Sequence, residues 1–426
     1  MRLLVFGFVL LFNGCSATAA AAATMTEVPV VGAMTSSSCD ILVRADSAVG
    51  VAIEYADNQY FNNSVMTSAV TATAANDYTA IVSLSGLNAD DVYWYRAVVD
   101  GAVQNSGFVH KFKTFPSASQ EFTFAVFADV APNDGAALAY KNAKDDGALF
   151  ALQIGDLDHR DPATLTEMRT MHREMKDPNK LHGHDFAMHI LSKMAVVHVW
   201  DDHDYGGNDE DKNFTGRSSA WQAFDEHWVT YARPNADAGL WHSFVVGDAE
   251  FFVLDLRSQR DPGTDTDDSD KSMLDGDEIA NDQKDWLKDG LNNSTATWKF
   301  IVSSVTMNPT ARPVSTDHWR VYSTERDELK DFIVDNDIEG VLLLTGDLHT
   351  GGAVDDGTNS AWGVPELCVP HTNLARGNTA NLGTWSEGVT SGAKGYGLVT
   401  VSADLVTMRA YGARGVIRHY LTVFAP

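Results

Sequence analysis

Cysteine is scarce in this sequence: three residues, Cys15, Cys39 and Cys368, stand among 426. So few cysteines exclude the dense disulfide framework of many small secreted proteins. If an N-terminal leader is removed, two cysteines remain, and a bridge between them would have to join the two domains predicted below. Stability is therefore expected to come from burial and hydrogen bonds, with bound metal as a further source.

Long apolar runs are also missing. The run LLVFGFVLLF follows Arg2 and has about half of the ~20 residues that a membrane-spanning helix needs. An alanine-rich stretch comes next, and the two together have the pattern of a secretory signal peptide. We expect residues 1–24 to be such a signal, which predicts a secreted, periplasmic or cell-envelope protein without a transmembrane helix. Lipidation of Cys15 is the alternative.

Basic residues are few beside acidic ones. The chain has 58 Asp and Glu against 31 Lys and Arg, a formal net charge of -27. Such a surface repels nucleic acids and anionic membranes, so no nucleic-acid binding is expected beyond a role as substrate. The sequence also has no Gly-x-Ser-x-Gly elbow and no Walker-type loop, which argues against a serine nucleophile and against nucleotide-driven work.

Hydrophobic residues are plentiful by contrast, at 44% of the chain, which is typical of a globular protein with a large core. Within residues 28–115, apolar and polar positions alternate in several short runs separated by Asn, Asp and Gly. The turn at 87–91 leads into a tyrosine-rich strand, the pattern of an immunoglobulin-like or fibronectin-like β-sandwich. We expect residues 28–115 to form such a domain, with a junction at 114–120.

The pattern changes from residue 121 onward. Continuous apolar strands alternate there with helical segments, and the last segments, from residue 395, resemble antiparallel strands. Strands that are apolar throughout are buried on both faces, so residues 121–426 are predicted to form an α/β domain. The strands are expected at 122–129, 148–156, 194–202, 250–257, 299–305 and 340–347, and helices at 136–146, 165–175, 279–290 and 325–336.

Four of these strands run directly into residues of the types that bind metals. The carboxyl ends of strands in an α/β sheet face one edge, where ligand sites form, so the four ends are expected to surround one crevice. The residues brought there would be Asp129, Asp156, Asp202, His203, Asp347 and His349.

A single Gly-Asp pair after a strand is most often only a turn, and a lone loop histidine is usually solvated. The run WDDHDYGGND, at 200–209, differs because it holds four acids and a histidine directly after a buried strand. Carboxylates this close raise each other's pKa unless cations lie between them. Two metals about 3.5–4 Å apart that share a carboxylate are a standard device for phosphate-ester hydrolysis, in which a metal-bound hydroxide attacks phosphorus.

The order of these motifs resembles that of the calcineurin-type metallophosphoesterases, and of the alkaline phosphatase D family in particular. The resemblance rests on Trp200-Asp201-Asp202-His203-Asp204, on Gly155-Asp156, on Asp255-Leu256-Arg257 and on Gly346-Asp347-Leu348-His349. It spans nearly the whole chain after the predicted signal. It implies a four-layer sandwich, two mixed sheets flanked by helices, behind the N-terminal β-sandwich. It also implies a metal-dependent hydrolase of phosphate mono- or diesters, with small phosphate esters as substrates.

The same resemblance assigns roles to individual residues. Asp156 would bridge two metals, Asp129 and His349 would help to hold the first, and Asp202 and Asp347 the second. His203 would lie beside the substrate oxygen, as proton donor or as a stabiliser of charge on phosphorus. Asn208 and Arg257 are weaker candidates for phosphate contacts, and Arg257 is more readily explained as an ion-pair partner of Asp255.

Two positions depart from the family pattern. Asp129 stands where cysteine is common, and His159 stands where tyrosine is common. Asp and His accept Zn, Fe or Mn about equally well, so ferric iron is not specifically favoured at the first site. The second site is rich in carboxylates and has no obvious additional histidine, which favours Ca²⁺. The alternatives are a phospholipase-type phosphodiesterase and a catalytically altered metal-binding scaffold, and the sequence indicates no oligomeric state.

Overall fold

The computed structural model describes residues 22–132, 135–276, 283–360, 362–374, 377 and 379–426. The predicted signal peptide, except for its last three residues, lies outside this part of the chain, as do Cys15 and the first residues of the helix expected at 279–290. Within the described residues, no helix has both the length and the apolar character needed to span a bilayer.

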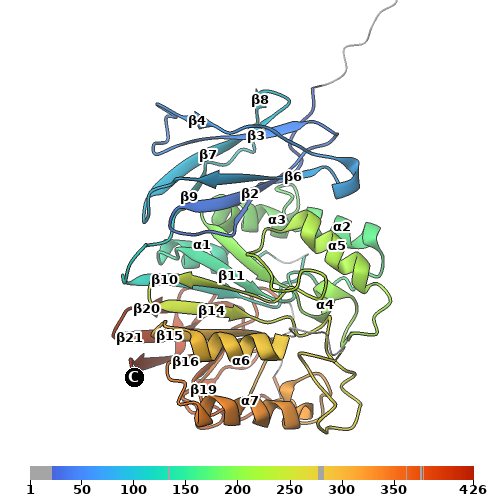
Figure 1. The fold of residues 1–426 in the computed structure, drawn as a ribbon, viewed down its shortest axis with the longest axis vertical. Helices are drawn as coiled ribbons and strands as arrows, with labels where there is room; N and C mark the ends of the chain where they lie inside the picture. Colours follow the sequence, from blue (N-terminus) through green and yellow to red (C-terminus); the bar gives the residue numbers. More distant parts are fainter. Residues whose placement is uncertain (1–21, 133–134, 277–282, 361, 375–376, 378) are drawn as a thin grey trace, which may run out of the picture.

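The N-terminal residues form two antiparallel sheets packed face to face (Figure 1). One sheet has the order β1-β2-β6, and the other has the order β4-β3-β7-β8, with β5 pairing to β3 and β9 to β7. The backbone N–H of Asn88 donates to the hydroxyl of Tyr93 (2.9 Å), which fixes the turn before β7 as the tyrosine-rich motif predicts. The strands are β1 (Val30–Gly32), β2 (Ser38–Arg44), β3 (Gly50–Ala56), β4 (Val65–Met66), β5 (Val70–Thr71), β6 (Thr79–Ser85), β7 (Val92–Val99), β8 (Ala102–Val103) and β9 (His110–Lys113).

Two mixed sheets form the centre of the remaining chain. The first has the order β12-β11-β10-β20-β21-β22, in which β10, β11 and β12 are parallel. The second has the order β13-β14-β15-β16-β18-β17-β19. The first sheet contains β10 (Phe122–Phe127), β11 (Phe150–Ile154), β12 (Ala195–Val199), β20 (Gly395–Val401), β21 (Leu405–Gly412) and β22 (Ile417–Phe424). The second contains β13 (His242–Val246), β14 (Ala249–Val253), β15 (Trp298–Val305), β16 (Val341–Gly346), β17 (Ala353–Asp355), β18 (Glu366–Cys368) and β19 (Gly388–Val389).

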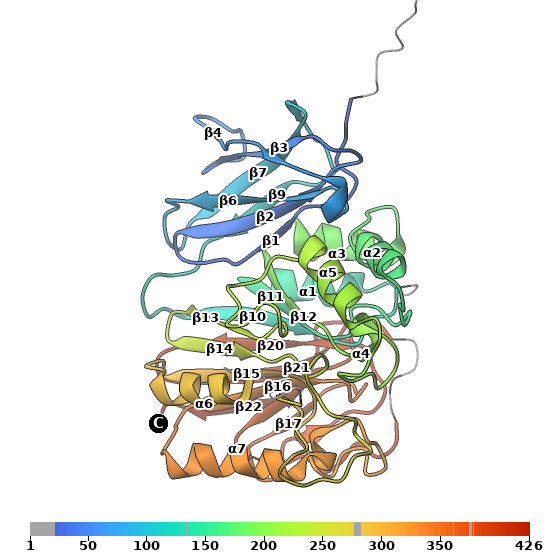
Figure 2. The ribbon, with the colours of Figure 1, turned by 45° about the vertical axis from the view of Figure 1, so that its right-hand side comes forward.

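Helices cover the outer faces of both sheets (Figures 1 and 2). Helices α1 (Ala137–Asp145), α2 (Leu165–Glu174), α3 (Leu181–Phe186) and α5 (Arg217–His227) lie between the sandwich and the first sheet. Helices α6 (Gln283–Asn293) and α7 (Ser323–Asp335) lie on the far side of the second sheet, and the one-turn helix α4 (Asp202–Tyr205) follows β12. Helix α2 begins with a capping box, in which Thr164 and Glu167 satisfy each other's backbone N–H groups. The predicted four-layer architecture is confirmed.

Aromatic rings fill the space between the two mixed sheets. Phe124 and Phe150 of the first sheet stack at 5.1 Å, and Phe251 and Phe300 of the second stack at 4.9 Å. Phe124 meets both rings of the second sheet edge-on, an arrangement that aromatic quadrupoles favour. This core is continuous with the apolar interior of the N-terminal sandwich. Cys39 and Cys368 are both buried and free, so no disulfide joins them.

A buried polar network also joins the sandwich to the α/β part. Asp77, beside β6, accepts hydrogen bonds from Arg44 of β2 and from Nε2 of His227 in α5 (3.2 Å). Lys176 donates to Nδ1 of His227 (3.2 Å), so His227 is neutral with its proton on Nε2. Burial alone would raise the pKa of Asp77, but the hydrogen bonds from His227 and Arg44 hold it well below its usual range. Burial and Lys176 lower the pKa of His227 to about 3.

Asp77→Asn is expected to lower the free energy of unfolding at pH 7 by about 3 kcal/mol, because it leaves buried cations without their partner. Stability of the wild type should fall below about pH 6.5, where the unfolded chain protonates His227 and the folded chain does not. The difference in free energy of unfolding between wild type and variant should become smaller below about pH 4. At that pH Asp77 takes up a proton when the wild type unfolds, which favours the unfolded state. Urea unfolding from pH 3 to pH 8 measures both effects. The exposed Asp57→Asn is the control, and a variant as stable as wild type at pH 7 would contradict the network's role.

Candidate metal centre

The predicted ligands follow strands that end earlier than the apolar pattern suggests. Strand β10 stops at Phe127 and β11 at Ile154. Asp129, Asp156 and Asp347 then adopt left-handed backbone conformations, with φ of 54°, 51° and 57°. Such conformations are uncommon for residues other than glycine and gather at functional sites, where the surrounding structure enforces them. Each turn takes the chain out of the sheet plane, so the carboxylates gather at the sheet edge.

Only glycine fits sterically at the first position of the Gly-Asp motif. Gly155 has φ of 90°, and a Cβ placed on it would lie 2.5 Å from the Cβ of Asp201. A larger residue would push the chain after β11 away from the chain after β12, and would therefore separate the carboxylates that the two strands supply.

The first group of ligand atoms is contributed by the ends of three strands. One ligand atom from each of Asp129, Asp156, Asp347 and His349 lies within 4.8 Å of the others. Nε2 of His349 lies 3.4 Å from Asp129 and 4.0 Å from Asp156. The structure thus brings together four residues that the sequence places after three different strands.

His159 lies beside this group in an orientation that suits a metal ligand. Its Nδ1 lies 2.8 Å from the carbonyl oxygen of Val130, to which it donates, so Nε2 is the nitrogen that would bind a metal ion once its proton is displaced. This Nε2 lies 3.2 Å from Asp156 without hydrogen-bond geometry. Burial alone would lower the pKa of His159, but the charge of Asp156 raises it to about 10.

The unsatisfied atoms of this group show what it can hold. Both carboxylate oxygens of Asp129 and of Asp156, and Nε2 of His159 and His349, are buried without a hydrogen-bond partner. Burying so many polar atoms unpaired is unfavourable, whereas a divalent cation accepts carboxylate oxygens and imidazole nitrogens together. The donor set therefore fits a bound metal ion.

A second group shares Asp156 with the first. Asp156 comes together with Asp201 and Asp202, and Asp202 with Asp209 and Asp317. Burial raises the pKa of Asp202 to about 7, with Asp156 and Asp317 adding to the effect and Arg257 opposing it. Asp156 is thus the carboxylate common to both groups, the place that the resemblance assigns to the bridging residue.

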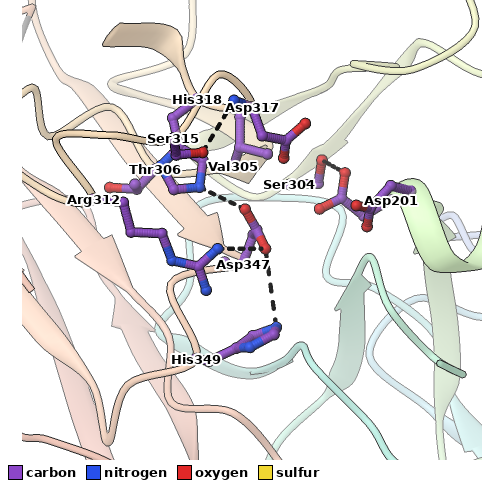
Figure 3. A network of polar contacts seen from close by, with 12 residues as sticks. Asp201, Ser304, Val305, Thr306, Arg312, Ser315, Asp317, His318, Asp347 and His349 are labelled. Atoms are coloured by element: carbon purple, nitrogen blue, oxygen red, sulfur yellow. Dashed lines mark hydrogen bonds and ion pairs between the residues drawn. The ribbon is translucent and has the colours of Figure 1, made fainter. Parts of the chain in front are cut away.

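A histidine that the sequence did not mark lies beside the second group. Nε2 of His318 lies 2.7 Å from Asp347, and Asp317, His318 and Asp347 form a further ligand group. Arg312 approaches the same carboxylate at 3.7 Å, and Figure 3 shows both side chains directed toward it. The loop after β15 supplies all three of Arg312, Asp317 and His318, and the apolar pattern of that strand alone did not mark them.

Arg257 is fully buried, and its ion-pair partners differ from the expected one. Its side chain donates to Asp201, and it makes a two-pronged pair with Asp317 (2.7 and 2.9 Å). Asp255 instead accepts from the backbone N–H groups of Arg257 and Ser258 and from the indole N–H of Trp200 (2.8 Å). A guanidinium held in this way supports the carboxylates from behind and has no free face for a phosphate.

His203 lies at the open side of the groups, 15% exposed, and its ring centroid is 4.4 Å from that of His159. Its Nδ1 forms a short hydrogen bond with Asp161, which leaves Nε2 for other partners. Sequence reasoning missed Asp161, although it stands two residues beyond His159. Asn208 is exposed in the turn after α4, and its neighbour Asp209 is the residue that reaches Asp202, through its backbone N–H (2.8 Å).

Two stretches of the chain match a known protein family. Residues 138–372, more than half of the chain, match the family described as PhoD-like phosphatase, and residues 18–116 match that family's N-terminal domain. The chain belongs to the PhoD-like phosphatase family. The sequence resemblance to the alkaline phosphatase D family is thereby confirmed.

Individual relatives agree with this membership. The chain is 26% identical over 356 residues to alkaline phosphatase D of Bacillus subtilis (strain 168), a match that covers 72% of this chain and 59% of that protein. A structure of PhoD superimposes with a TM-score of 0.75 at 19% identity and covers 94% of this chain and 91% of the other. The purple acid phosphatase PPD1 of yellow lupin (Lupinus luteus) seeds has a TM-score of 0.67 at 12% identity, over 95% and 74% of the two chains. These two likenesses show that this chain has the same overall fold as each of the two structures.

Asp156→Asn is expected to lower the metal content of the purified protein from about two ions per chain to less than one, because both groups lose their common carboxylate. Elemental analysis after exhaustive dialysis measures this content. The exposed Asp237→Asn, a matched change away from the site, should keep the wild-type content. Equal metal content in the Asp156 variant and the wild type would show that Asp156 bridges nothing.

Proposed function

We propose that this PhoD-like phosphatase hydrolyses phosphate mono- or diesters outside the cytoplasm. The observation that carries the proposal is the position of Asp156, whose carboxylate belongs to both acidic groups while its two oxygens have no hydrogen-bond partner. A site built to hold two cations around one carboxylate suits phosphoester hydrolysis. The chain spans 59% of the length of alkaline phosphatase D of Bacillus subtilis.

The residues fall into two sets according to the cation that each would hold. We assign Asp129, Asp156, His159 and His349 to the first cation, and Asp156, Asp202 and Asp347 to the second. Cations held there would neutralise the phosphate and lower the pKa of a water molecule toward neutrality. Arg257 acts indirectly, because its buried guanidinium holds the carboxylates of Asp201 and Asp317 in place and lowers the pKa of Asp317 against the effect of burial.

His203 is the proposed catalytic acid. It is partly exposed and lies beside both Asp156 and His159. Burial alone would lower the pKa of His203, but the charges of Asp156 and Asp202 raise it, which favours the protonated form that a leaving group needs. The carboxylate of Asp161 fixes the ring through Nδ1, so that Nε2 can donate to the departing oxygen. Asp161 is thus a positioning residue.

We propose Zn, Fe or Mn at the first site, because it combines carboxylates with two imidazole nitrogens. At the second site, Nε2 of His318 is already engaged by Asp347. We therefore propose that His318 orients Asp347, and that the oxygens of Asp156, Asp202 and Asp347 hold Ca²⁺.

The chain also has a proposed domain organisation and a proposed export signal. We propose residues 1–24 as a signal peptide, with lipidation of Cys15 as the alternative, residues 28–115 as an N-terminal domain and residues 121–426 as the catalytic domain. Small phosphate esters are the proposed substrates.

Purified full-length protein should turn over p-nitrophenyl phosphate, bis-p-nitrophenyl phosphate or both, and should lose this turnover in EDTA. The ratio of the two rates ranks monoester against diester hydrolysis. Fully metallated, folded protein that hydrolyses neither ester would refute the proposed activity and favour a metal-binding scaffold.

His203→Ala is expected to lower the turnover of an alkyl phosphate by about 100-fold, since the poor leaving group needs a proton. The loss with p-nitrophenyl phosphate should be much smaller, because p-nitrophenolate leaves without one. Asp161→Asn should lower the turnover of the alkyl phosphate by about tenfold, and the turnover of p-nitrophenyl phosphate by less. His189→Ala, at a half-buried position in the helical turn after α3, is the control. Equal losses with both leaving groups would exclude His203 as the proton donor.

A further inference from the structure

A hollow lies where the N-terminal sandwich meets the first mixed sheet. It has a volume of about 750 Å³, and we call it the junction pocket. Trp94 of β7 and Lys111 of β9 line it from the sandwich, and Lys144, Leu149 and Lys193 line it from the α/β part. The backbone N–H of Lys111 in β9 donates to the carbonyl oxygen of Ser192 (3.0 Å), which joins the two parts of the chain at this junction.

The junction pocket gathers positive charge in an acidic protein. Its lining includes four lysines, Lys111, Lys113, Lys144 and Lys193, and two carboxylates, Asp90 and Glu121. The excess of two positive charges (four minus two) contrasts with the net charge of -27 for the chain. Such a concentration of one sign attracts ligands of the opposite sign.

Not all of these ammonium groups are neutralised by neighbours. Lys113 pairs with Asp90 at 2.5 Å, and Lys144 pairs with Asp145. Lys193 donates to the carbonyl oxygen of Val109 (2.7 Å), which carries no full charge. Lys111 is exposed, and it makes no ion pair within the part of the chain that the structure describes.

Strand register explains how the aromatic ring and the lysines share one wall. Trp94 of β7 is directly opposite Lys111 of β9, and Val92 is opposite Lys113. Cross-strand partners point to the same face of a sheet, while His110 and Phe112 alternate to the buried face. Trp94 is therefore flanked by ammonium groups on an open sheet face.

The α/β side of the junction pocket adds further positive charge. Burial lowers the pKa of Lys193, and the charges of Lys111 and Lys144 lower it further. Apolar residues, among them Leu149 and Met194, complete this wall. The junction pocket thus offers an aromatic ring, apolar surface and several cations together.

We propose that the junction pocket binds an acidic sugar unit of a polysaccharide. The carboxylate or sulfate of such a unit pairs with the lysines, and the C–H face of its ring packs on Trp94. A ring-free inorganic polyanion would leave the aromatic and apolar wall without a partner. A neutral sugar would leave the lysines without one.

The position of the junction pocket makes it an attachment site rather than a part of the metal centre. Phe122, Leu149 and Met194, at the amino ends of β10, β11 and β12, line it. The metal-binding groups follow the carboxyl ends of the same strands. The stretch from Phe122 to Asp129 covers about 23 Å of extended chain, so one small ester cannot contact both sites.

The test is equilibrium binding of full-length protein to oligogalacturonate, a carboxylate sugar, with dextran as the neutral sugar and inorganic polyphosphate as the ring-free polyanion. Oligogalacturonate should bind in a salt-dependent manner, and dextran should not bind. Lys111→Gln and Trp94→Ala should each weaken oligogalacturonate binding by about tenfold. Turnover of p-nitrophenyl phosphate should stay unchanged in both variants, which separates this site from the proposed activity.

Lys141→Gln, an exposed lysine of α1 outside the junction pocket, is the matched control and should bind as wild type does. Lys111 is exposed, so a folding defect in Lys111→Gln is not expected, and its circular dichroism spectrum checks this. The proposal is overturned by absence of oligogalacturonate binding, by equal binding in wild type and variants, or by binding of polyphosphate alone. Self-association that Lys111→Gln abolishes, found by sedimentation, would assign the junction pocket to a second copy of the acidic chain and would also overturn it.

Discussion

The mutual repulsion of carboxylates around Asp156 is the constraint on which the rest of the catalytic part depends. Asp129, Asp202 and Asp347 all share a ligand group with Asp156. Asp129, Asp156 and Asp347 also adopt left-handed backbone conformations. Both features are unfavourable in isolation, and the surrounding fold must maintain them. The two mixed sheets, locked by stacked phenylalanines, supply the rigid edge from which these residues project.

Arginines pair with some of the carboxylates at this edge, and others are left for bound cations. The buried Arg257 neutralises Asp201 and Asp317 from behind, and Arg312 approaches Asp347 from the loop after β15. Asp129 and Asp156 have no such arginine within the described residues. The part of the site without an arginine is therefore the part whose polar atoms have no hydrogen-bond partner, which is where metal ions are proposed to bind.

Much of the fold could be predicted because its signals are local. Alternating polarity marks the sandwich strands and continuous apolar runs mark β10, β11, β12 and β16, so the layers follow from pattern and topology. The proximity of residues that directly follow those strands, such as Asp156 and Asp347, could be predicted for the same reason, because parallel strands present their carboxyl ends at one edge. Their role as metal ligands stays a prediction.

The residues that sequence reasoning missed have no such local signal. His318 and Arg312 come from a long loop after β15, and only the three-dimensional path of that loop brings them to Asp347. Arg257 was expected to pair with its neighbour Asp255, but the strand edge turns it toward Asp201 and Asp317. Asp161 reaches His203 from 42 positions away, a contact that no spacing rule within one element can reveal.

The most direct measurement is anomalous X-ray diffraction from crystals of the metallated protein. Two anomalous peaks are expected, about 3.5–4 Å apart, with the carboxylate of Asp156 between them. One peak beside Asp129, His159 and His349 and the other beside Asp202 and Asp347 would agree with the ligand assignment. A single peak, or two peaks that do not share Asp156, would contradict a two-cation site organised around this carboxylate.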